Sequence, residues 1–235
     1  MNTRKNVISE ERMEKFDVVI VGSGPGGMSA AAHAAELGLS HVLLEGSPKH
    51  SNTIQKYQKG KHVMDTPARL PLRSPLEFSA NTRENILHAW LQGMDQTKTN
   101  IQYNSEVTAI EGVKGEFILS TAAGAKIQAK SVILGIGVQG NPRKMPCPGA
   151  EYEHVQYQLD DPQEYNGERI AVVGAGDAAI ENAIGLAGSN TVTIINRKDE
   201  FARAKQGNLD AILSAIGDAK IDCQYESNPD RIELN

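Results

Sequence analysis

The chain has 235 residues, enough for one large or two medium domains that each bury an apolar core. Its 24 basic and 29 acidic side chains give a formal net charge of -5, which argues against a general nucleic-acid binder. The two cysteines, Cys147 and Cys223, form no C-x-x-C motif, and the six histidines show no metal-ligand spacing. Neither a disulfide framework nor a metal site is predicted.

The first 15 residues are polar, and we expect them to form a flexible N-terminal lead-in. They lack the apolar stretch of a secretion signal. No segment approaches the roughly 18 uninterrupted apolar residues of a membrane span. The sequence therefore predicts a cytoplasmic protein with no membrane span.

Residues 17–45 have the pattern of a strand, a helix and a second strand. The run from Asp17 to Val21 is β-branched and ends in glycines, as does a strand buried on both faces of a parallel sheet. An alanine-rich helix should begin at Pro25 and end at Gly38, and a second strand should run from His41 to Glu45.

Residues 46–79 are rich in proline and irregular, which is typical of a binding or lid loop. Asn81 and Glu84 then resemble a capping box. Ile86, Trp90 and Met94 follow at helical spacing and predict an amphipathic helix of about three turns. Ordinary core packing explains this helix.

Three strand-like segments, 106–111, 116–121 and 126–129, predict an antiparallel meander. Residues 131–137 should return as a buried strand, and the strand, glycine and helix pattern starts again at Arg169. We therefore expect two domains, residues 16–150 and residues 151–235.

The first glycine-rich turn is a dinucleotide fingerprint that follows a strand and opens a helix. Its residues are Gly22, Ser23, Gly24, Pro25, Gly26 and Gly27. The glycines permit a sharp turn, let the backbone approach a pyrophosphate and allow the helix to pack closely on the sheet. The N-terminus of the helix stabilises the negative charge of the phosphates. Glu45 ends the next strand, where a carboxylate accepts hydrogen bonds from ribose hydroxyls; a solvated strand-end charge is the alternative.

A second fingerprint repeats the pattern in the later part of the chain. Its residues are Gly174, Ala175, Gly176, Asp177, Ala178 and Ala179. The following strand ends in basic rather than acidic residues, namely Arg197 and Lys198, with Arg203 soon after. Such a cluster suits a 2′-phosphate and favours NADP(H) over NAD(H), although Asp199 and Glu200 dilute its field. The alternative is a solvated basic helix start.

These motifs together resemble the flavoproteins with two dinucleotide-binding domains, the pyridine nucleotide-disulfide oxidoreductase superfamily, and within it the thioredoxin reductase-like branch. The matching segments are residues 19–27, 131–137, 172–183 and 196–201. The resemblance implies an α/β fold of two Rossmann-like domains, each with a parallel sheet and the first with the meander. It also implies FAD in the first domain and NADP in the second, with the Val107 backbone at the adenine and Gly137 in a flavin-domain turn.

The chain also departs from this family. Residues 155–161 occupy the place of the redox C-x-x-C of the thioredoxin-reducing members but contain no cysteine. The sequence stops at Asn235, before the segment that returns to the flavin domain, so the chain is C-terminally incomplete relative to the family. Lys61, His62 and Arg69 are cations of the long loop that could stabilise a reduced flavin, with solvated charges as the alternative.

The resulting hypothesis is an FAD-dependent oxidoreductase that takes hydride from NADPH, with NADH as a second donor. The electron acceptor is a small molecule or a protein: a ferredoxin-type protein, a quinone, a small disulfide or oxygen. A flavin-dependent monooxygenase and a nucleotide-binding fragment of a longer flavoprotein are the alternatives. A homodimer, or association with a longer electron-transfer assembly, also stays open.

Overall fold

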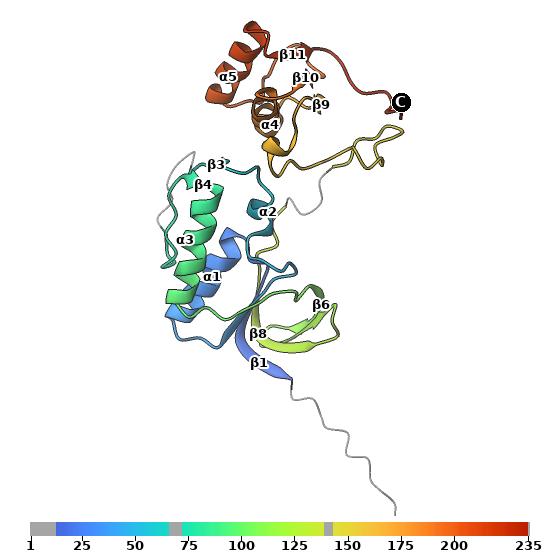
Figure 1. The fold of residues 1–235 in the computed structure, drawn as a ribbon. Coiled ribbons are helices and arrows are strands. Elements are labelled where there is room, and N and C mark those ends of the chain that lie inside the picture. Colours follow the sequence, from blue (N-terminus) through green and yellow to red (C-terminus); the bar gives the residue numbers. More distant parts are fainter. Residues whose placement is uncertain (1–12, 66–71, 139–142, 235) are drawn as a thin grey trace, which may run out of the picture. The chain divides into compact units, whose positions relative to one another are not determined.

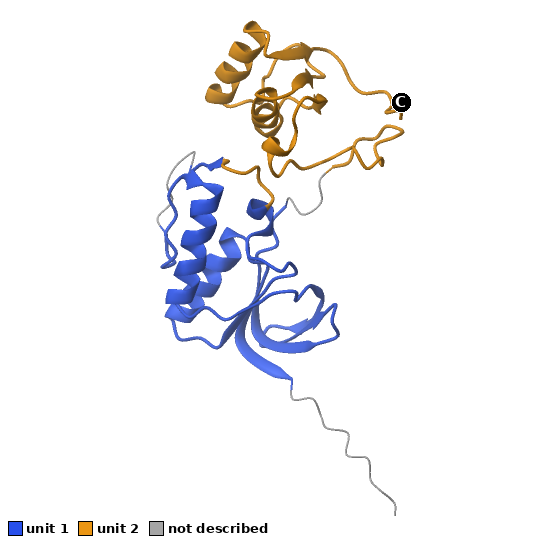
Figure 2. Cartoon of the chain, viewed as in Figure 1, with its two compact units in different colours: residues 1–55, 62–140 blue, residues 56–61, 141–235 orange. Residues whose placement is uncertain are grey.

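The computed structural model describes residues 13–65, 72–138 and 143–234 and divides into two compact units (Figure 2). Unit 1 comprises Met1–Gln55 and His62–Gly140. Unit 2 comprises Lys56–Lys61 and Asn141–Asn235. A short piece of the long loop thus belongs to the second unit.

Unit 1 is built on a six-stranded sheet with the order β5-β2-β1-β8-β7-β6. Strands β5, β2, β1 and β8 are parallel to one another, and β8, β7 and β6 form an antiparallel meander. The predicted α/β class with a parallel sheet and a meander is confirmed. In chain order the elements are β1 (Glu14–Val21), α1 (Pro25–Glu36), β2 (His41–Leu44), α2 (Asn52–Gln55), β3 (His62–Val63), β4 (Asn81–Thr82), α3 (Arg83–Gln96), β5 (Ile101–Gln102), β6 (Val107–Val113), β7 (Glu116–Thr121) and β8 (Lys126–Leu134).

Apolar side chains fill both faces of this sheet. Helix α1 buries Met28, Ala31 and Ala32, and it runs beside α3 (Figure 1). A separate cluster joins Val19, Val42 and Leu44 of the parallel strands to Leu119, Ile127 and Ala129 of the meander. The later residues of β1 and all of β2 are therefore buried on both faces, as is usual in a parallel sheet.

Strand β8 differs from the sequence prediction. A meander strand over 126–129 and a separate strand over 131–137 were expected, but one strand spans Lys126–Leu134. No glycine or proline interrupts this strand. Lys130, between the two expected segments, donates a hydrogen bond from Nζ to Asp17 Oδ1 of β1 at 2.7 Å. Residues 127–134 of β8 therefore pair with β1 along its length.

The carboxyl half of β8 is also more exposed than expected. Ile133 is 42% exposed and Leu134 is 59% exposed. Strand β7 pairs only with the first part of β8, as far as Ala129, so the later residues have β1 as their strand neighbour on one side alone. The prediction of a buried strand over 131–137 is wrong for this reason.

Helix α3 confirms the predicted buried face but not the predicted cap. Ile86, Trp90 and Met94 are all buried. The N-cap is Thr82, whose hydroxyl accepts a hydrogen bond from the Asn85 backbone N–H. The side chain of Asn81 instead accepts from the N–H of Thr82, one residue before the helix. The expected cap at Asn81 is therefore displaced by one residue.

Two other expectations concern segments that the structure describes only in part. Residues 1–12 of the expected lead-in lie outside the described residues, as does Arg69. Residues 14 and 15 belong to β1. Among the residues that the structure describes, no helix combines the length and apolar character needed to cross a membrane.

Unit 2 contains a three-stranded parallel sheet with the order β11-β10-β9. Its core gathers Ile180 of α4, Ile194 of β10, Ile212 of α5 and Ile221 of β11. This is the second parallel sheet predicted from the repeated glycine motif. In chain order the elements are the short 3₁₀ helix η1 (Pro162–Glu164), β9 (Arg169–Val173), α4 (Asp177–Ala187), β10 (Thr191–Ile195), α5 (Gln206–Gly217) and β11 (Ile221–Gln224).

The domain boundary expected after residue 150 stays a prediction. In the compact units, residues 143–150 group with unit 2, and hydrogen bonds tie them to its later parts. The Ile232 N–H donates to the Pro148 carbonyl at 2.9 Å, and the Met145 N–H donates to the Tyr157 hydroxyl at 3.0 Å. The division of the compact units therefore falls between residues 140 and 141.

Candidate functional site

The first glycine turn lies between the end of β1 and the start of α1. Gly22 has a φ of +92°, and a Cβ atom there would come within 2.7 Å of the Gly135 carbonyl oxygen. A Cβ atom on Gly27 would overlap the Gly22 carbonyl oxygen. Backbone therefore packs directly on backbone, and neither position can carry a side chain without a shift.

The opening of α1 has room and free donors for an anion. Gly24 is the N-cap and makes no side-chain cap bond, Pro25 is the first residue, and the first turn holds no acidic residue. A Cβ atom on Gly26 would meet nothing within 4 Å. The residues present therefore fit a dinucleotide pyrophosphate, because uncapped N–H groups and the helix dipole stabilise negative charge.

Gly135 is a residue of this site that the sequence prediction missed. Gly137, which was predicted, has a φ of +63°, and a Cβ atom there would meet nothing within 4 Å. Gly135 instead donates its N–H to the Val21 carbonyl at 2.7 Å and lies against both Gly22 and Gly27. The available signal was its place two residues before Gly137, in the same segment of the sequence.

Glu45 follows β2 and fixes the glycine turn from the neighbouring strand. Its Oε2 atom accepts from the Ser23 N–H at 2.9 Å and from the Ser23 hydroxyl at 2.5 Å. Its Oε1 atom accepts from the Ser47 N–H at 2.8 Å. The side chain is buried, which by itself raises the pKa of Glu45, but the hydrogen bonds from Ser23 and Ser47 outweigh burial and lower that pKa.

Most of the acceptor capacity of the ionised Glu45 carboxylate is used within the protein. A carboxylate has about four lone-pair sites. Ser23 and the Ser47 N–H occupy three of them, and the Ser47 hydroxyl also hydrogen-bonds this carboxylate. A bound ribose hydroxyl would therefore share or replace one of these donors. Glu45 thus has one observed role, holding Ser23, and one role that stays a prediction, binding ribose.

Val107 begins β6 and lies beside the same corner of the sheet. The Ser105 N–H donates to the Glu45 carbonyl at 2.7 Å, and a Cβ atom on Gly46 would lie 3.4 Å from the Cβ of Glu106. The structure therefore brings the backbone before Val107 next to Glu45. Its contact with an adenine stays a prediction.

The second glycine turn joins β9 to α4. Gly174 has a φ of +136° and donates its N–H to the Ile195 carbonyl at 3.0 Å. A Cβ atom on Gly174 would lie 3.3 Å from the Cβ of Ala179, so this pair is tight although it is less crowded than the first turn. Gly176 is the N-cap of α4, Ala175 packs against the core and Ala178 is exposed.

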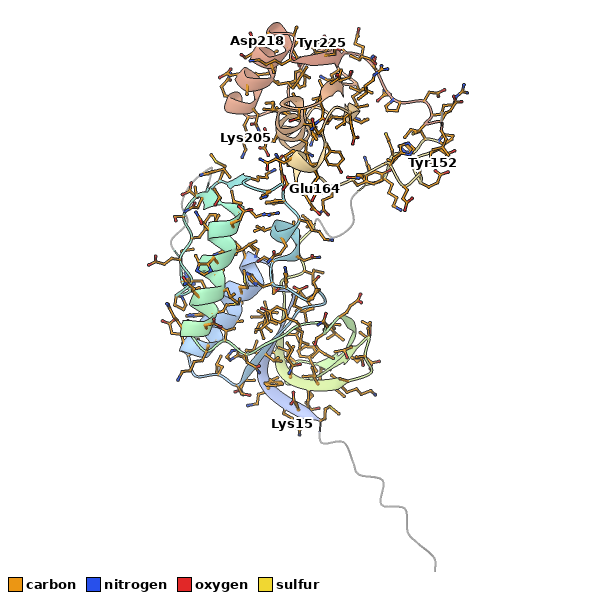
Figure 3. All side chains as sticks on the ribbon, viewed as in Figure 1. Lys15, Tyr152, Glu164, Lys205, Asp218 and Tyr225 are labelled. Carbon is orange, nitrogen blue, oxygen red and sulfur yellow. The ribbon has the colours of Figure 1, made fainter. Side chains whose placement is uncertain are left out.

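Asp177 is the first residue of α4 and connects this turn to α5. Its Oδ1 atom accepts from the Lys205 N–H at 2.9 Å and from Asn208 Nδ2 at 2.8 Å. The hydrogen bond from the Lys205 backbone, followed by that from Asn208, lowers the pKa of Asp177. Lys205 marks the start of α5 (Figure 3). The observed partners of Asp177 are therefore protein groups, and its predicted cofactor contact remains untested.

The predicted basic cluster lies on the turn after β10. Strand β10 pairs with β9 so that Ile195 lies opposite Val173, and the turn therefore emerges at the same edge as Gly174. Arg197, Lys198 and Arg203 are exposed. Their side chains form no hydrogen bond or ion pair with any residue that the structure describes.

Asn196 supports this basic turn and was not predicted as a site residue. Its side chain is buried, with Oδ1 accepting from the Lys198 N–H at 3.0 Å and Nδ2 donating to the Glu200 carbonyl at 2.9 Å. Phe201, at the far side of this turn, packs edge-on against Tyr225, with ring centroids 6.0 Å apart. The available signal was an Asn at a strand end, where it often caps a turn.

Replacing the neighbouring glycines Gly26 and Gly27 of the first turn should change stability by very different amounts. Gly27→Ala creates an overlap with the Gly22 carbonyl and should lower the free energy of unfolding by more than about 2 kcal/mol. Gly26→Ala places its methyl group in open space within α1, and its effect should stay within about 1 kcal/mol. Urea unfolding followed by circular dichroism measures both. Equal losses in the two variants would contradict the close packing described for Gly27.

The hydrogen bonds of Glu45 should make stability depend on pH. Because folding lowers the pKa of Glu45, its contribution is complete above the ordinary glutamate pKa and is lost as the pH falls through the folded pKa. Glu45→Gln should therefore cost about 1.5 to 3 kcal/mol at neutral pH and progressively less in acid. Urea unfolding over a pH series measures this difference. Glu116→Gln, on the exposed surface of β7, should cost less than about 0.5 kcal/mol.

Curated proteins of related sequence extend beyond this chain. A ferredoxin–NADP reductase of Ignicoccus hospitalis is 27% identical over 200 residues, which is 85% of this chain and 62% of that enzyme. A ferredoxin–NADP reductase of Gluconobacter oxydans is 31% identical over 212 residues, which is 88% of this chain and 59% of that enzyme. The chain thus spans about three fifths of the length of these relatives.

A solved structure supports the fold, and a family model supports the assignment. The bacillithiol disulfide reductase of Staphylococcus aureus superposes with a TM-score of 0.84 at 20% identity, over 94% of this chain and 69% of that protein. The family model described as pyridine nucleotide-disulphide oxidoreductase matches residues 19–233, a range that includes both glycine turns. The chain therefore belongs to the pyridine nucleotide-disulphide oxidoreductase family.

Proposed function

We propose that this protein is an FAD-dependent oxidoreductase that takes reducing equivalents from NADPH. The observation that carries the proposal is the pair of glycine turns, each at a strand-to-helix junction but with opposite charge on the next strand end. Glu45 follows β2 beside the first turn, and Arg197 with Lys198 follows β10 beside the second. An acid there suits ribose hydroxyls, whereas a basic pair suits a 2′-phosphate.

The residues of unit 1 would bind FAD and hold it in place. The uncapped N–H groups of α1 would bind its pyrophosphate, Glu45 its ribose, and the backbone near Val107 its adenine. When bound, FAD supplies the two-electron redox chemistry that no amino-acid side chain provides. The protein contributes binding, orientation and electrostatics.

The residues of unit 2 would bind NADPH. The N-terminus of α4, after Gly174 and Gly176, would receive the pyrophosphate, and Arg197, Lys198 and Arg203 would surround the 2′-phosphate. Asn196 would position this basic turn through its bonds to Lys198 and Glu200. The donor preference therefore depends on the turn after β10.

A ferredoxin-type protein is the acceptor that we favour among those consistent with the sequence. Residues 155–161 contain no cysteine, so this chain has no dithiol there to accept electrons from the flavin. Two relatives are described as ferredoxin–NADP reductases, which supports an external electron-transfer protein.

Visible absorption of the purified full chain tests the proposed cofactor. Flavin bands should be present as purified or appear after addition of FAD, and the chromophore released from the protein should be FAD. Anaerobic titration with NADPH should bleach these bands at lower concentration than titration with NADH. A chain that neither retains FAD nor is reduced by either nucleotide would refute the proposal. Formation of a hydroxylated product coupled to NADPH use would favour monooxygenase activity instead.

The basic turn should control the choice between NADP(H) and NAD(H). Replacing both Arg197 and Lys198 with Ala should raise the Kd for NADP⁺ by about 10-fold to 100-fold, because charge-assisted hydrogen bonds are lost. The Kd for NAD⁺ should change by less than about twofold. Isothermal titration calorimetry measures both. Lys220→Ala removes an exposed cation paired with Asp218 and should alter neither Kd; equal weakening for both nucleotides in the double variant would contradict this role.

A further inference from the structure

Segment 56–61 is attached to the second nucleotide site rather than to the flavin side of the long loop. The Lys59 N–H donates to the Asp160 carbonyl at 2.7 Å, and its Nζ lies 3.0 Å from Asp161 Oδ2. Gln58 lies so close to Gly185 that a Cβ there would be 2.5 Å from its Nε2. These contacts anchor the segment on η1 and α4, within unit 2.

Lys61 ends this segment and forms an ion pair with α4. Its Nζ lies 2.6 Å from Glu181 Oε2 and 5.0 Å from the ring centroid of Tyr57. The Lys61 side chain is only 22% exposed, and that of Glu181 is 31% exposed. Glu181 Oε2 is itself buried, and no described residue donates it a hydrogen bond of good geometry. The charge of this oxygen is therefore compensated by Lys61.

Glu181 and Asp177 form a carboxylate pair at the start of α4. They are four residues apart, so they share one face of the helix. Asn208 Nδ2 donates to both, at 2.8 Å to Asp177 Oδ1 and 3.1 Å to Glu181 Oε1. The positive charge of Lys61 also contributes to lowering the pKa of Asp177. One network thus joins Lys61 to the first residue of the helix.

This carboxylate pair poses an electrostatic problem that the first site does not have. Helix α1 has no acidic residue in its first turn, and its only carboxylate is at its last residue, Glu36. Helix α4 has two carboxylates near the end that would receive a dianionic pyrophosphate. Negative charges near this end of the helix oppose the binding of an anion, and the effect is strong where water is partly excluded.

We propose that Lys61 is a positioning residue of the second dinucleotide site, where its ammonium group offsets Glu181 and Asp177 so that α4 can accept a nicotinamide dinucleotide pyrophosphate. The proposal rests on the proposed function of unit 2 as a dinucleotide-binding unit. It assigns a role to a loop lysine that the sequence could only place near a flavin. Lys61 acts on the pyrophosphate, whereas Arg197 and Lys198 would act on the 2′-phosphate.

Calorimetric titration of the full chain with NADP⁺ and NAD⁺ tests the proposal. Lys61→Met should raise the Kd for both nucleotides by the same factor, about threefold to tenfold, because both carry the pyrophosphate. Adenosine 2′-monophosphate, which lacks a pyrophosphate, should bind the variant and the parent protein equally. An unchanged Kd for NADP⁺ and NAD⁺ would overturn the proposal, as would a loss confined to NADP⁺.

Three further variants separate charge from packing. Lys59→Met breaks the neighbouring ion pair of the same segment and should leave both Kd values within about twofold. Lys61→Arg keeps the charge and should keep the affinity. The double variant Lys61→Met with Glu181→Gln removes both charges and should recover the parent affinity. Loss of affinity in Lys59→Met, or no recovery in the double variant, would show that the segment acts through packing alone.

The single variant Glu181→Gln tests the charge argument even if Lys61→Met does not fold. With Lys61 present and one carboxylate removed, the dinucleotides should bind more tightly than to the parent protein. Weaker binding would overturn the charge argument. Failure of the parent protein to bind either dinucleotide would instead refute the proposed function of unit 2, so the two failures are distinguishable.

Discussion

Where a parallel strand passes directly into a helix, the backbone segments come so close that a few positions have little or no space for a Cβ atom, and both units depend on this steric constraint. In unit 1 the glycines Gly22, Gly27 and Gly135 bring three backbone segments into contact. In unit 2 the corresponding pair is Gly174 and Ala179. The absence of side chains leaves helix N–H groups accessible at each turn, and this access makes both turns candidates for phosphate binding.

The two turns are tuned differently by the residues around them. Glu45 approaches the first turn from β2 and fixes Ser23 through two hydrogen bonds. At the second turn, Asp177 faces protein donors and the acidic side of α4 is balanced by Lys61. The same backbone geometry therefore requires different electrostatic support in the two units.

The sequence predicted those parts of the fold that depend on local chemistry. Pro25 at a helix start, the apolar strand before Gly22 and the helix face of Ile86 and Trp90 all follow from neighbouring residues. The continuity of β8 could not be predicted in this way, because the pairing of Lys130 with Asp17 joins residues far apart in the chain. The same limit applies to the site. Glu45 and the basic turn were recognisable from spacing, whereas the partner of Lys61 required the fold.

The placement of segment 56–61 affects how this protein can exchange parts with its relatives. Unit 2 is discontinuous, since it takes six residues from within the stretch that forms unit 1. Recombination at residue 140 would transfer Glu181 but leave Lys61 with the other parent. Such a hybrid would carry Glu181 from one parent and the residue at position 61 from the other. Segment 56–61 and the part of the chain after residue 140 should therefore be exchanged together.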